Sequence, residues 1–103
     1  MIMDVMSTDD RQAAQRRLND LLTILKAVPQ QDLLGRLIEE TEALGRAIHA
    51  FHLEGIRFRI YNVDRMVTHP PVPLPADTPA IVADVRKHLE AAGFHTRSHQ
   101  APQ

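Results

Sequence analysis

The sequence predicts an α+β fold, in which an N-terminal antiparallel helical hairpin precedes a β-α-β unit with a small two- or three-stranded sheet backed by helices. Two observations predict this class. In the first half of the chain, apolar residues recur at spacings of three and four, as in amphipathic helices. After Gly55 the spacing changes to two, which is the period of a half-buried strand. With 103 residues and a hydrophobic share of 44%, the chain 1–103 is expected to form a single domain.

The first helix is expected over residues 8–28. Ser7, with Asp10 three positions later, resembles a capping box with Asp in place of Glu, and Pro29 ends the pattern. One side of this helix is apolar, and it consists of Ala14, Leu18, Leu21, Leu25 and Val28.

A second helix is expected over residues 31–54. Gly55 can take the left-handed conformation in which helices often end. Because a short turn containing Pro29 separates the two helices, they should form an antiparallel hairpin. The apolar stripe of the second helix consists of Leu34, Leu37, Thr41, Leu44, Ile48 and Phe51.

Residues 56–68 are expected to form a strand or a hairpin. Ile56, Phe58 and Ile60 alternate with polar residues at 57, 59 and 61, so the two sets should face opposite sides of a sheet. At Asn62 the alternation slips by one residue. A bulge would absorb the slip in one long bent strand, whereas a turn at 62–64 would make a hairpin; we favour the bent strand.

The last third of the chain is expected to complete the β-α-β unit. Residues 69–77 are rich in proline and should form an extended connector. A helix over 78–92 follows, with Thr78 as its cap, Pro79 in its first turn and Gly93 past its end. Residues 94–99 alternate again and should form a second strand, parallel to the first.

Composition narrows the function classes. The net charge is −1, so the chain as a whole has no long-range attraction for nucleic acid or anionic membranes. The absence of cysteine excludes disulfides and thiolate chemistry, and no apolar run approaches a membrane span of about 20 residues. We therefore expect a cytoplasmic protein with no membrane partner. No catalytic motif is present, and we expect no cofactor.

A cationic surface is the first candidate site. On neighbouring strands, Arg57, Arg59 and Tyr61 would share one sheet face with Arg97, between His95 and His99. Guanidinium groups pair with phosphates or carboxylates, and a tyrosine ring offers a stacking platform, so this face could bind nucleic acid or an acidic partner. A solvated sheet face explains the same alternation and is the more ordinary interpretation.

Metal ligation is the second candidate. His49 and His52 lie one turn apart and could share one ion, although neither belongs to a motif that couples a ligand to a base. Glu39, Glu40 and Glu42 form the densest acidic cluster, which could hold a divalent ion. Solvated helix surfaces explain both groups, so we expect no metal site.

These observations favour a small cytoplasmic, self-associating interaction or adaptor protein without catalytic activity of its own. We expect a homodimer, because a small sheet and a long apolar helical stripe would otherwise leave apolar surface exposed. Its further partner would be an unidentified protein. The alternative hypothesis is a nucleic-acid-binding module that uses the cationic sheet face.

Overall fold

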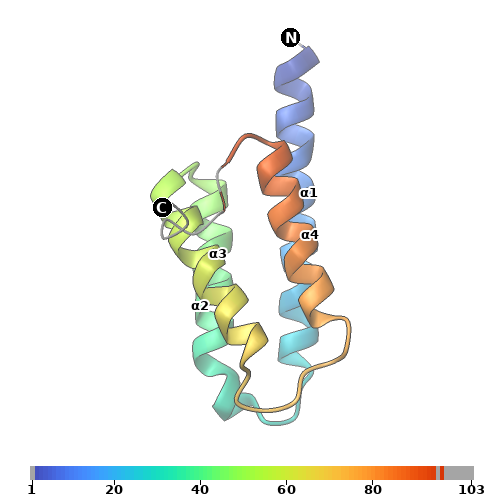
Figure 1. The fold of residues 1–103 in the computed structure, drawn as a ribbon, viewed down its shortest axis with the longest axis vertical. Coiled ribbons are helices and arrows are strands. Elements are labelled where there is room, and N and C mark those ends of the chain that lie inside the picture. Colours follow the sequence, from blue (N-terminus) through green and yellow to red (C-terminus); the bar gives the residue numbers. More distant parts are fainter. Residues whose placement is uncertain (1, 95, 97–103) are drawn as a thin grey trace.

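The part of the chain that the structure describes folds into four antiparallel helices. The computed structural model describes residues 2–94 and 96, and the side chains of residues 9–94 and 96. Successive helices run in alternating directions, and α1 contacts both α2 and α4, so the four helices close into a bundle (Figure 1). The helices are α1 (Ile2–Lys26), α2 (Gln31–His49), α3 (Leu53–Thr68) and α4 (Thr78–Ala91).

The prediction of an α+β fold is wrong, because the described residues contain no strand. Residues 56–68, expected as a strand or hairpin, form most of α3. The buried positions of α3 are Ile56, Ile60, Val63 and Val67, spaced by four, three and four residues. The alternation of apolar and polar residues therefore breaks at Asn62 because the segment follows the helical period and not the period of a strand. Phe58, which the alternation grouped with the buried isoleucines, is 49% exposed.

The second expected strand, 94–99, falls partly outside the described residues, since 95 and 97–99 are not described. Phe94 and Thr96 lie in no regular element. Gly93 has a φ of 101° and ends α4, and the N–H of Phe94 donates to the carbonyl of Leu89 at 2.9 Å. This pattern of left-handed glycine and backward hydrogen bond is the Schellman ending of a helix.

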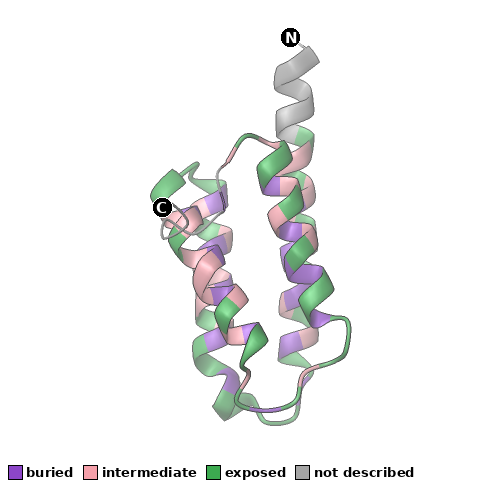
Figure 2. Cartoon of the chain, in the orientation of Figure 1, coloured by how far each residue is buried: buried purple, intermediate pink, exposed green. Residues whose placement is uncertain are grey.

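The core is built from one apolar stripe on each helix (Figure 2). The stripes expected on the two N-terminal helices are buried within the single chain, except Phe51, which is 61% exposed. Thr41 is the polar member of the α2 stripe, and its hydroxyl donates to the carbonyl of Leu37 at 2.8 Å. In one chain, α3 and α4 thus cover the apolar surface that the sequence alone left without a partner.

The proline-rich connector 69–77 crosses one end of the bundle (Figure 1). Val72 is buried and Leu74 packs partly against the core, while Pro71 and Pro73 are exposed. The connector therefore closes the end of the core next to the α1–α2 turn. The residue that precedes α4 is Asp77, one position before the expected cap.

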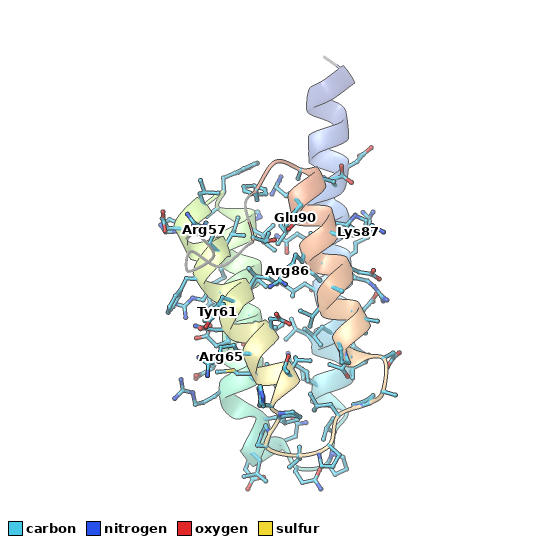
Figure 3. All side chains as sticks on the ribbon, in the orientation of Figure 1. Arg57, Tyr61, Arg65, Arg86, Lys87 and Glu90 are labelled. Carbon is cyan, nitrogen blue, oxygen red and sulfur yellow. The ribbon has the colours of Figure 1, made fainter. Side chains whose placement is uncertain are left out.

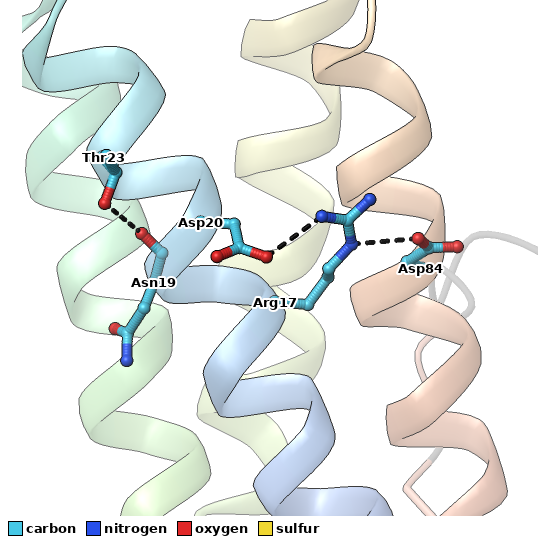
Figure 4. A network of polar contacts seen from close by, with 5 residues as sticks. All are labelled: Arg17, Asn19, Asp20, Thr23 and Asp84. Carbon is cyan, nitrogen blue, oxygen red and sulfur yellow. Dashed lines mark hydrogen bonds and ion pairs between the residues drawn. The ribbon is translucent and has the colours of Figure 1, made fainter.

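Ion pairs on the outside tie α1 to α4. Arg17 Nε donates to Asp84 at 3.0 Å, and Arg17 Nη1 donates to Asp20 on its own helix at 3.0 Å (Figure 4). The hydrogen bonds that Arg17 donates to Asp20 and then to Asp84 raise the pKa of Arg17 above its ordinary value. These side chains are all at least one third exposed, so the pairs contribute little to stability.

The α2–α3 turn has an unusual backbone. Phe51 has a φ of 57°, and the N–H of His52 donates to the carbonyl of Ala47 at 2.9 Å, again a Schellman ending. Phe51 thus holds the left-handed position that was expected of Gly55. Gly55 instead lies in the first turn of α3, where its N–H donates to Nδ1 of His52 at 2.9 Å.

Candidate functional site

The surface of α3 opposite its buried stripe is the candidate site. Phe58, Tyr61 and Arg65 are spaced by three and four residues, so a helix brings them to one outward stripe. Arg57 lies beside this stripe, and Arg57, Tyr61 and Arg65 follow one another along α3 in Figure 3. These four residues are called the α3 outer face below.

Arginine side chains lie against the aromatic rings of this surface. The guanidinium carbon of Arg59 is 5.2 Å from the centroid of the Phe58 ring, and that of Arg65 is 5.8 Å from the Tyr61 ring. Both distances fall within the range of cation–π attraction. The face therefore presents flat aromatic surface together with guanidinium donors, two groups enriched in protein–protein interfaces.

The positive charge of the α3 outer face is only partly neutralised. Arg57 Nη1 lies 3.8 Å from a carboxylate oxygen of Glu54, whose side chain is 79% exposed, so this contact is weak. Within the described part of the chain, no carboxylate lies within ion-pair distance of Arg65. Asp64 is directed to α4, where Arg86 Nη2 donates to it at 3.3 Å.

A shallow pocket adjoins Arg65. It has a volume of about 300 Å³ and is lined by Asn62, Arg65 and Met66 of α3 and by His69, the residue that follows α3. This volume is at the lower end of small ligand pockets, and it could hold one side chain of a docked chain.

The three candidate arginines and Tyr61 do not form the predicted surface. Arg57 and Arg59 are two residues apart and point roughly 200° apart around the helix. Arg59 turns to α2, where its Nη1 donates to Glu40 at 2.7 Å, and Glu40 is only 15% exposed. Arg97 lies outside the described residues. The described residues lack a sheet. Arg57 and Tyr61 lie close together because they are four positions apart on the helix α3.

The candidate metal ligands are dispersed. His52 is engaged by its hydrogen bond to the N–H of Gly55, and His49 is exposed in the last turn of α2. Glu42 pairs with Lys26 at 3.2 Å, on the opposite side of α2 from Glu40 and its partner Arg59. Among the described residues no three histidine, aspartate or glutamate side chains gather as a metal site would require.

Two residues of the α3 outer face were missed. Phe58 was assigned to the buried side and Arg65 was placed after a turn or bulge. The signal was present in the spacing, because positions 58, 61 and 65 match a helical period as well as positions 56, 60, 63 and 67 do.

Comparison of the chain with protein-family models, with curated proteins and with solved structures finds no match. Over the described residues, no helix combines the length and the apolar character needed to cross a membrane.

Proposed function

We propose that this chain is a small cytoplasmic interaction protein that docks a protein partner on the outer face of α3. The observation that carries the proposal is the exposure of Phe58 at 49%, stacked with Arg59 on a helix whose other side supplies the core. A chain with three phenylalanines would stabilise its own fold better by burying this ring. An exposed aromatic framed by arginines has the composition of an interface hot spot.

The helical scaffold supports this role. Val63 and Ile60 are fully buried on the inner side of α3, so the residues between them are held on a packed helix and not on a loop. A rigid helix loses little conformational entropy when a partner binds, which favours affinity. The lack of cysteine is compatible with a reducing compartment and supports the cytoplasmic assignment.

The test is selection of peptides from a random display library on the wild-type chain and on Phe58→Ser. We expect peptides to be enriched on the wild-type chain, and their affinity to fall by tenfold or more on Phe58→Ser, on the order of 1.4 kcal/mol or more. Because Phe58 is half exposed, the free energy of unfolding of the variant should lie within about 0.5 kcal/mol of the wild-type value.

Leu33→Ser is the matched control, since Leu33 is 54% exposed but lies at the start of α2. Enriched peptides should bind this variant as they bind the wild type. The proposal fails if no peptide is enriched, or if the enriched peptides bind Phe58→Ser as tightly as the wild-type chain.

A further inference from the structure

We infer that the partner docked on the α3 outer face is an acidic amphipathic segment, with Asp or Glu on both sides of an apolar side chain. This inference rests on the proposed function and names the chemistry of the partner. Its basis is the positive charge at the two ends of the face, where Arg57 is weakly paired with Glu54 and Arg65 has no described carboxylate within ion-pair distance, and the apolar surface between them.

The charges set the ends of the site. From Gly55 to Val63 the chain contains no carboxylate. Of the two arginines in this stretch, Arg59 is paired with Glu40 and Arg57 makes the weak contact with Glu54. Arg65 follows directly after Asp64, which is paired with Arg86. Arg57 and Arg65 are eight residues apart, so they are separated by about 12 Å along the helix. A partner that neutralises both guanidinium groups needs carboxylates at about that separation.

The aromatic rings set the middle of the site. Phe58 and Tyr61 lie between the two arginines in the sequence, and the pocket of about 300 Å³ adjoins Arg65 on the side of Met66. An apolar side chain of the partner would cover Phe58 and leave the flanking carboxylates beside the arginines. In a helical partner, carboxylates two turns apart with an apolar residue between them satisfy this spacing.

Charge also disfavours two other occupants. A second copy of the chain in a two-fold contact would set Arg57 and Arg65 against their own equivalents, and like charges in an interface cost affinity. The α3 outer face contributes two arginines, Arg57 and Arg65, fewer than the row of phosphate contacts on which the affinity of a nucleic-acid-binding surface depends.

The test uses the peptides enriched on the wild-type chain and asks what they contain. We expect them to be rich in Asp and Glu, and their affinity, measured by fluorescence anisotropy, to weaken when salt is raised from about 50 to about 500 mM. Arg65→Glu should weaken binding by about tenfold or more. Arg65 is exposed and its guanidinium lies over the Tyr61 ring, outside the core, so this variant should fold, which its helical circular dichroism would verify.

Arg16→Glu on α1 and Arg36→Glu on α2 are matched controls, because both arginines are exposed and the charge change is the same. Peptide affinity should be unchanged in both. Arg57→Gln, a milder change at the other end of the face, should weaken binding by several-fold.

Four results would overturn the inference, and they separate it from the proposed function. Enriched peptides that are neutral or basic, or acidic peptides that ignore Arg65→Glu, leave the docking surface in place and remove only the acidic partner. No enrichment at all removes both. Salt-sensitive binding of a short mixed-sequence oligonucleotide, lost in Arg65→Glu, without peptide enrichment would assign the face to nucleic acid.

Discussion

At the scale of single residues, Phe51 shows the cost of an exposed aromatic in a strained position. Its φ of 57° is a conformation that glycine and asparagine adopt readily and phenylalanine seldom does. The ring lies 4.2 Å from the Arg11 guanidinium and 6.1 Å from the Phe94 ring. These contacts, worth about 1–2 kcal/mol together, offset a strain of similar size.

Substitution at Phe51 separates strain from contact. Both Phe51→Ala and Phe51→Asn lose the ring contacts, but only asparagine is at ease in the left-handed region. We expect Phe51→Asn to be more stable than Phe51→Ala by about 0.5–1 kcal/mol in chemical denaturation. Equal stabilities would mean that the backbone at residue 51 is not strained.

The sequence could not locate this turn correctly. Phe51 follows Ile48 by three residues and so continues the apolar stripe of α2, while Gly55 is the residue that ordinarily ends a helix. The end of α2 is decided instead by packing, because Ile48 is fully buried and Phe51 is not. The preferences of single residues do not show at which residue the packing of α2 against the core stops.

At the scale of elements, α3 shows why a short alternation misleads. Residues 56–61 alternate between apolar and polar side chains over only six positions, and β-branched and aromatic residues there favour a strand. A helix satisfies the longer pattern, since it buries Ile56, Ile60, Val63 and Val67 together in the core while α3 packs against α2 and α4. Tertiary burial of four large side chains outweighs local preferences of a few tenths of a kcal/mol each.

The set of residues that forms the candidate site also depends on α3 being a helix. The arginines at 57 and 59 were recognisable from the sequence as a potential binding group. Which residues share a surface with each of them depends on whether the segment has the period of a strand or of a helix. A period of two groups Arg57 with Arg59, whereas the helix groups Arg57 with Tyr61 and Arg65 and sends Arg59 to Glu40. The composition of the site was therefore partly predictable, and its geometry was not.

Two glycines in helices should respond oppositely to alanine. A Cβ at Gly35, inside α2, would meet nothing within 4 Å, so Gly35→Ala should stabilise the fold by about 0.5–1 kcal/mol. A Cβ at Gly55 would lie 2.6 Å from Nδ1 of His52 and 3.3 Å from Cβ of Ala47. Gly55→Ala would displace the imidazole that caps α3, so we expect a loss of about 0.5–1 kcal/mol.

Thermal and denaturant unfolding of the two variants, each followed by circular dichroism, would measure the difference. A Gly55→Ala variant stabilised as much as Gly35→Ala would show that His52 does not cap α3.

At the scale of the whole molecule, the closed bundle changes the reasoning about self-association. The homodimer was predicted because the hairpin stripes needed a cover, and α3 and α4 supply that cover within one chain. The charge of the α3 outer face also disfavours a two-fold contact there. A homodimer stays a prediction, and it would have to use another surface.

Light scattering at micromolar concentration tests the predicted homodimer. A mass of twice 11.6 kDa that is unchanged in Arg65→Glu would support a dimer formed away from the α3 outer face. A mass of 11.6 kDa would contradict the homodimer and leave the docking of a different protein unaffected.

The most direct test of the docking surface is a map of where a bound peptide touches the chain. Backbone amide shifts of the wild-type chain would be followed by NMR during titration with the tightest acidic peptide from the selection. The account predicts that the largest shifts fall on residues 54–65 of α3, with Arg86 of α4 beside them. Shifts that gather on the outward sides of α1 and α2, with α3 unchanged, would contradict it.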